Sequence, residues 1–129
     1  MKGEFIKTEH FEIKIIDGVL EVSFSERLDL TLPIAKNFVK ERLLISANRA
    51  LPMLMDVRNI KSIDKESRDY LSHKSNNMYV SAGAMLVCNE IQRLLGMIFI
   101  FYYSVTIPYK LFETKEQAYS WLCHFKSLN

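Results

Sequence analysis

The stretch 54–70, LMDVRNIKSIDKESRDY, constrains the fold more than any other part of the chain, because an apolar run leads directly into a polar loop and a helix start. Asp56 closes the apolar run 51–55, which predicts a buried strand. Asp64 stands where a helix N-cap is expected, since its side chain can accept hydrogen bonds from free backbone N–H groups. Strand-to-helix corners present functional groups in open α/β sheets. We therefore expect residues 56–67 to form a functional site at an edge of the sheet.

Apolar periodicity divides the chain into strands and helices. Two strands flank Asp17-Gly18, a dipeptide that favours a tight hairpin turn because it tolerates positive φ. Later strands alternate with helices, which predicts parallel pairing through right-handed crossovers. The expected strands are 10–16, 19–24, 53–57, 82–87 and 109–112, and the expected helices are 31–45, 65–78, 90–103 and 114–128. The order ββαβαβαβα predicts an α/β fold with a mixed sheet, in which an antiparallel hairpin precedes parallel βα units and the strand 53–57 lies in the interior.

Length and composition limit the class of protein. The chain has 129 residues, 49% of them hydrophobic, and no linker-like stretch, so we expect a single domain over residues 1–129. A net charge of +2 with interspersed acids and bases forms no basic face, which argues against nucleic acid as a partner. The longest apolar stretch, 94–107, has about 14 residues where a transmembrane helix needs about 20, and the N-terminus has no signal segment. We expect a cytoplasmic protein without a transmembrane segment.

The sequence offers no constellation of catalytic side chains. Cys88 and Cys123 lack CxxC or histidine spacing, and we interpret both as reduced thiols in the core. The three histidines fall on separate expected elements, and zinc spacing, a Gly-rich phosphate loop and a G-x-S-x-G motif are all missing from the sequence. A divalent ion held only by Asp56 and Asp64 would bind weakly. We assign no catalytic, cofactor-binding or metal-binding residue and do not expect an enzyme.

Residues 56–67 resemble the signature loop of STAS domains, the family of SpoIIAA-like anti-sigma factor antagonists. The segments Asp56-Val57-Arg58-Asn59-Ile60 and Ile63-Asp64-Lys65-Glu66-Ser67 follow a family pattern of D-L-S-x-V-x-x-I-D-S-S-G. The resemblance implies a SpoIIAA-like fold and a small bacterial regulatory protein that acts by contact with a protein partner. In regulatory members, a serine just after the second aspartate is phosphorylated by a partner kinase.

This chain departs from the family at the phosphorylation position. Lys65 and Glu66 stand where the family has two serines, and Ser67 stands where it has glycine. One hypothesis is that the Glu66 carboxylate resembles the phosphorylated state, although a phosphate carries about −1.5 to −2 charges. Another is that Ser67 is a displaced phosphate acceptor. The partner loop implied by the resemblance comprises Asp56, Arg58, Asn59, Asp64, Glu66 and Ser67.

A purely structural interpretation of the same loop stands beside these hypotheses. In it, Asp64 caps a helix, and Glu66 favours the positive end of that helix. Asp56 then accepts backbone hydrogen bonds at the end of a strand, as aspartate often does in turns.

The stretch 94–103, LLGMIFIFYY, is apolar around every side of its expected helix, and such a helix needs cover on all sides. Three interpretations remain open: the helix is buried within the molecule, it forms a homodimer interface, or it binds a small apolar ligand. The last draws on a resemblance between the SpoIIAA-like fold and the lipid-binding domain of Sec14-type proteins. Membrane-surface attachment is not favoured, because the helix lacks a lysine-rich polar face. The candidate contact residues are Met97, Phe99, Phe101 and Tyr102.

Two functions are compatible with these patterns. The favoured one is a non-catalytic, STAS-like regulatory or protein-interaction module that acts through the loop 56–67. The alternative is a small apolar-ligand or lipid-binding protein of SpoIIAA/Sec14-like fold that uses the helix 94–103.

Overall fold

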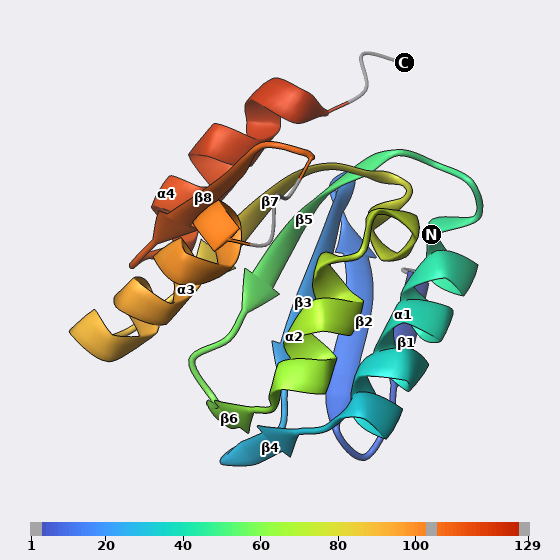
Figure 1. Cartoon of the computed structure of the whole chain (residues 1–129). Helices are drawn as coiled ribbons and strands as arrows, with labels where there is room; N and C mark the ends of the chain where they lie inside the picture. The colour runs from blue at the N-terminus through green and yellow to red at the C-terminus, as the bar shows by residue number, and fades with distance from the viewer. Residues whose placement is uncertain (1–3, 103–105, 127–129) are drawn as a thin grey trace.

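A mixed six-stranded sheet forms the middle of the computed structural model, which describes residues 4–102 and 106–126 (Figure 1). The strands are β1 (Glu4–Lys7), β2 (Phe11–Ile16), β3 (Val19–Phe24), β4 (Leu28–Leu30), β5 (Leu51–Asp56), β6 (Ile60–Ile63), β7 (Val80–Leu86) and β8 (Tyr109–Phe112). The helices are α1 (Leu32–Ser46), α2 (Lys65–Ser72), α3 (Glu90–Tyr102) and α4 (Lys115–Leu122), with short 3-10 helices η1 (Lys74–Asn77) and η2 (Cys123–Phe125). The strand order in the large sheet is β1-β2-β3-β5-β7-β8.

The predicted mixed topology is confirmed. Strands β1, β2 and β3 pair antiparallel, whereas β3, β5, β7 and β8 pair parallel, with α1, α2 and α3 in the crossovers. Asp17 and Gly18 both have positive φ, 51° and 78°, and join β2 to β3 as the predicted two-residue hairpin turn. Strand β5 lies between β3 and β7, so the prediction of an interior strand is also confirmed.

The main helices lie on both faces of the sheet. On one face, α1 contributes Phe38 and Val39 to a core with Ile13, Val22 and Met53. Helix α3 packs against β8 on this same face, where Phe99 contacts Tyr109. Helix α4 covers the opposite face. A second core lies on that face, where Ala118 and Leu122 of α4 pack with Val19, Leu54, Ala82 and Ala84.

Three short strands were not predicted from the sequence. Strands β4 and β6 pair in parallel as a separate two-stranded sheet, so residues 60–63 are a strand and not the loop that the sequence predicted. The reason is the length of β4, because three residues are too few to show a period, although two of them, Leu28 and Leu30, are buried in the core. The third missed strand, β1, extends the antiparallel edge of the large sheet.

Two helices end earlier than predicted. Helix α2 ends at Ser72, where residue 78 was expected, and the side-chain nitrogens of Asn76 and Asn77 then donate to the carbonyl oxygens of Tyr70 and Leu71. These bonds satisfy the free carbonyls of the helix end, which explains the change to a 3-10 turn. Helix α4 also changes to a 3-10 turn after Leu122, and the end expected at residue 128 lies outside the described residues.

Arg42 is an unusual core residue, because its side chain is only 1% exposed. Its Nη2 atom donates to the Asn76 carbonyl oxygen at 3.0 Å, which connects α1 to η1. Its Nη1 atom has no hydrogen-bond partner in the described part of the chain. Burial lowers the pKa of the Arg42 guanidinium, because the charged form loses hydration there.

An ionic cluster also attaches α4 to the sheet. Glu21 on β3 accepts hydrogen bonds from Tyr119 and, at 2.8 Å, from Lys115 Nζ. Burial alone would raise the pKa of Glu21, but the bonds from Lys115 and Tyr119 outweigh it and lower the pKa. Burial and, to a smaller extent, the hydrogen bond to Glu21 raise the pKa of Tyr119. The cluster therefore holds an ionised carboxylate against α4 at neutral pH.

Candidate functional site

The loops that follow β3 and β5 meet at one edge of the sheet. These strands run parallel and end at Phe24 and Asp56, so the turn after each strand emerges on the same side. The small β4–β6 sheet, in which Leu30 pairs with Ile63, then leads into α1 and α2. We call residues 25–27 and 56–67 together the carboxyl-edge corner.

Asp56 and Arg58 form a two-pronged ion pair within the corner. The Arg58 guanidinium donates from Nε and Nη2 to the two Asp56 carboxylate oxygens at 3.0 and 2.9 Å. The Arg58 backbone N–H also donates to Asp56 Oδ1 at 3.1 Å, which closes a tight turn after β5. The hydrogen bonds that its side chain donates to Asp56 raise the pKa of Arg58. The Asp56 carboxylate is therefore occupied by its own loop.

Asn59 and Gln92 tie this turn to its neighbours. Asn59 Nδ2 donates to the Phe24 carbonyl oxygen at 3.2 Å, and the Leu28 backbone N–H donates to the Asn59 carbonyl oxygen at 3.2 Å. Gln92, in the first turn of α3, donates from Nε2 to the Arg58 carbonyl oxygen at 3.1 Å and accepts from the Cys88 backbone N–H at 2.9 Å. The loops after β3, β5 and β7 are thus joined by hydrogen bonds. Gln92 was not identified from the sequence, because nothing in its pattern indicates this long-range contact.

Asp64 is the N-cap of α2, as predicted. Its Oδ1 atom accepts a hydrogen bond from the Ser67 backbone N–H at 2.8 Å. Hydrogen bonding to Ser67 lowers the pKa of Asp64. Asp56 and Asp64 both have structural partners, and no cluster of three metal-binding side chains occurs within residues 4–102 and 106–126.

Ser67 has no exposed surface. Its hydroxyl donates to the Leu30 carbonyl oxygen at 3.3 Å, which ties α2 to β4. A kinase needs an accessible hydroxyl, so this burial argues against the hypothesis that Ser67 is a displaced phosphate acceptor. Glu66, one residue earlier, is exposed in the first turn of α2. Within the predicted partner loop, Ser67 is therefore a structural residue, whereas Glu66 is exposed to solvent.

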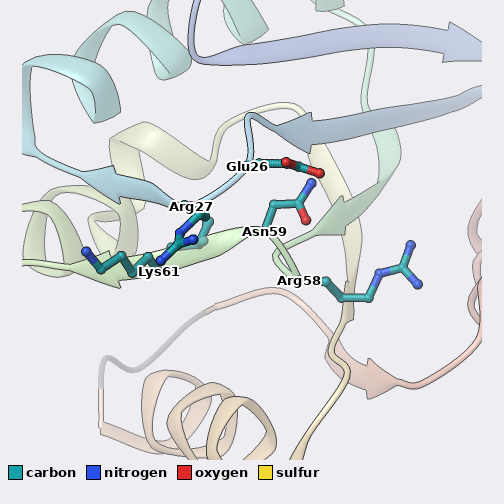
Figure 2. A pocket seen from close by; sticks show the side chains of 6 residues that line it. Glu26, Arg27, Arg58, Asn59 and Lys61 are labelled. Carbon is teal, nitrogen blue, oxygen red and sulfur yellow. The ribbon is translucent and has the colours of Figure 1, made fainter.

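A shallow hollow of about 330 Å³ opens in the corner, and charged side chains line it (Figure 2). Arg27 and Lys61 both line the hollow, and Arg58 extends away from them (Figure 2). Neither Arg27 nor Lys61 has an ion-pair partner among the described residues. Arg27 enters the site because β4 pairs with β6, a contact that the sequence did not predict. The lining residues are Glu26, Arg27, Arg58, Asn59, Ile60 and Lys61.

The second predicted site, α3, has two different faces. Phe101 is 77% exposed and Met97 is 45% exposed, so both lie on the outer face. Phe99 is half-buried and packs edge-on against Tyr109 of β8, with ring centroids 6.2 Å apart, so this residue faces the sheet. The Tyr102 side chain lies outside the described residues. Leu94, Met97, Ile98 and Phe101 line an open, apolar hollow of about 420 Å³.

Both cysteines lie outside the core. Cys88 and Cys123 are both exposed, so the interpretation that they are core thiols is wrong. Cys88 follows the last buried residue of the β7 region, and Cys123 follows the last buried residue of α4, so each lies just beyond an apolar pattern.

In the part of the chain that the structure describes, no helix is both long and apolar enough to cross a membrane.

Comparisons with known proteins support the fold. A family model described as "Domain of unknown function (DUF7793)" matches residues 11–126. No curated protein matches the chain. Among solved structures, an uncharacterized protein of the DUF3478 family with a SpoIIAA-like fold, from Shewanella loihica PV-4, is similar with a TM-score of 0.70. The two chains are 16% identical over 92% of this chain and 98% of the other, so the likeness shows the fold alone and confirms the predicted SpoIIAA-like class.

Proposed function

The chain belongs to the DUF7793 family, a family of domains of unknown function, and we propose that it is a regulatory protein-interaction module without catalytic activity. It binds a protein partner at the carboxyl-edge corner. The observation that carries this proposal is the construction of the corner, whose loops are held together by Asn59 and Gln92 while charged side chains remain exposed. Firmly held loops at the carboxyl ends of parallel strands are a common binding site in α/β proteins.

The hydrogen bonds of the corner also support a non-catalytic role. Two of its four carboxylates are occupied, because Asp56 binds the Arg58 guanidinium and Asp64 caps α2, whereas Glu26 and Glu66 are exposed. A general base needs a carboxylate that is free to reach a substrate proton. These carboxylates therefore serve to shape the corner, and the remaining exposed groups are suited to contact with another protein.

The charge pattern indicates the chemistry of that partner. Arg27 and Lys61 face solvent beside the hollow, and the Arg58 charge is already balanced by Asp56. A partner surface with carboxylates opposite Arg27 and Lys61 would be complementary, and such complementarity fixes orientation and speeds association. Glu66, at the start of α2, adds one negative position, which would face a basic group of the same partner.

The rival function, binding of a small apolar ligand or lipid along α3, has less support from the geometry. The outer face of α3 is apolar, but its hollow of about 420 Å³ is open to solvent. Binding sites for small ligands usually enclose most of the ligand surface. An open hollow leaves much of an apolar ligand in contact with water.

The test is quantitative affinity capture of the tagged chain from its own cells, with wild type, Glu66→Lys and Glu116→Lys compared. Glu116 is a matched control, because it is exposed in the first turn of α4, as Glu66 is in the first turn of α2. We expect Glu66→Lys to reduce recovery of a protein partner by about tenfold, which corresponds to about 1.4 kcal/mol of binding free energy. Glu116→Lys should retain it. Equal recovery of every captured protein by the three forms would contradict the proposal.

A further inference from the structure

Helix α3 carries a continuous apolar stripe on its outer face. Ile91, Leu94, Ile98 and Phe101 follow one another at steps of three, four and three residues, and all four are exposed. We call these four residues the α3 seam. This spacing is the one found along the contact line of paired helices, because it keeps successive side chains on one side of the helix.

The inner face of α3 fixes the direction of the seam. A Cβ atom added at Gly96 would lie 2.8 Å from Leu111 Cδ2, so the helix backbone is in close contact with β8 at that point. Phe99 packs against Tyr109 on the same side. At 100° per residue, the seam points directly away from Gly96. The helix cannot rotate to bury the seam without losing these contacts.

The exposed area is close to what a stable interface requires. The seam and its neighbours Leu95 and Met97 together expose on the order of 700 Å², if a fully exposed side chain of this size presents about 200 Å². A single apolar patch on a monomer rarely exceeds about 600 Å². A standard interface buries about 800 Å² on each partner.

We propose that the α3 seam is the interface between two copies of this chain. The same stripe on both copies gives a self-complementary contact, which is the arrangement in a two-fold symmetric dimer. Seam residues of one copy then pack between those of the other, as in other paired helices. A membrane surface is a poorer match for α3, because Arg93, its one basic residue, is paired with Glu113 at 2.8 Å.

Sedimentation equilibrium of the full chain, purified without detergent, tests this interface. We expect wild type to have twice the mass of one chain, and Leu94→Glu to raise the dimer dissociation constant at least about 100-fold, because it places an unpaired charge in the contact. The matched control is Leu44→Glu, an exposed leucine on α1 that should leave the dimer unchanged. Phe101→Ser, which adds no charge, should also weaken the dimer.

Circular dichroism and thermal unfolding of each variant establish that it is folded, as expected for substitutions at exposed positions. Three results would overturn the inference: wild type that is monomeric up to about 100 µM, Leu94→Glu that remains dimeric, or equal dissociation of Leu44→Glu and Leu94→Glu. A monomer that carries a tightly held apolar molecule would likewise overturn it, in favour of a ligand on α3. The Glu66→Lys variant should remain dimeric, so this test is independent of the carboxyl-edge corner.

Discussion

Ser67 is buried in the first turn of α2, where its hydroxyl donates to the Leu30 carbonyl oxygen. Arg42 is equally buried, but one of its guanidinium nitrogens has no hydrogen-bond partner in the described part of the chain. The two residues thus differ in how well the fold satisfies their polar groups. A satisfied buried group stabilises the fold modestly, whereas an unsatisfied donor costs about 1–3 kcal/mol.

We predict that Ser67→Asp lowers the free energy of unfolding by about 3–5 kcal/mol, because it places an unpaired carboxylate in the core. Ser67→Ala should cost about 1 kcal/mol, the net value of one hydrogen bond. Urea unfolding measures both changes, and Ser120→Asp on the exposed side of α4 is the control, with an effect within about 0.5 kcal/mol. A Ser67→Asp protein as stable as wild type would contradict the burial and restore Ser67 as a phosphate acceptor.

At Arg42 we predict that an apolar side chain of similar length is tolerated, unlike the charged side chain at position 67. Arg42→Met keeps an unbranched side chain in the core and removes both the unsatisfied donor and the bond to the Asn76 carbonyl oxygen, so the variant should unfold at about the same urea concentration as wild type. Arg42→Ala leaves a cavity and should lose about 2–4 kcal/mol. If Met and Ala prove equally destabilising, the charge of Arg42 contributes to stability and this account of its environment is wrong.

At the scale of elements, helix α4 depends on a charged contact as well as on its apolar face. Glu21 accepts hydrogen bonds from Lys115 and Tyr119, and its pKa is lowered below the usual 4.5. A carboxyl group with a lowered pKa in the folded state stabilises that state above its unfolded pKa, and this contribution is lost as the pH falls through the folded pKa. The contact is therefore fully formed at neutral pH.

We predict that Glu21→Gln lowers the melting temperature at pH 7. The difference from wild type should shrink as the pH is lowered below about 4.5, because wild-type Glu21 then becomes protonated as well. Scanning calorimetry of both proteins between pH 7 and pH 3 measures this change. The control is Glu12→Gln on the neighbouring strand, whose effect should stay small throughout. A difference that is independent of pH would contradict the ionic role of Glu21.

Elements could be predicted where local chemistry determines them. Asp17-Gly18 indicated the hairpin, and Asp64 indicated the start of α2, because turn and cap preferences act over a few residues. Strands β4 and β6 could not be predicted, because their pairing joins residues 28–30 to residues 60–63 and each strand is short. The place of Arg27 in the corner depends on that pairing, so it was missed as well.

The sequence could not show which face of α3 packs on the sheet, for a different reason. The helix is apolar on both sides, so periodicity could not distinguish Phe99, which faces β8, from Phe101, which faces solvent. The exposure of Cys88 and Cys123 was missed because each lies one residue beyond a buried run. Such end positions depend on how the neighbouring elements pack, which the sequence pattern does not contain.

At the scale of the whole molecule, the two proposed surfaces are physically connected and functionally separate. Gln92 in the first turn of α3 binds the Arg58 carbonyl oxygen of the carboxyl-edge corner. The α3 seam lies on the outer side of the same helix. A dimer formed through the seam would therefore carry two copies of the corner, each available to its own partner, and bivalent binding strengthens attachment to a multivalent target.

The central claim, that the carboxyl-edge corner binds a protein, is tested most directly by native mass spectrometry of chain purified gently from its own cells. Wild type and Glu116→Lys should both carry a second, different polypeptide, and Glu66→Lys should lack it. All three should otherwise have the same oligomeric state. Wild type that carries no other protein, or that carries only a small apolar molecule, would contradict the account.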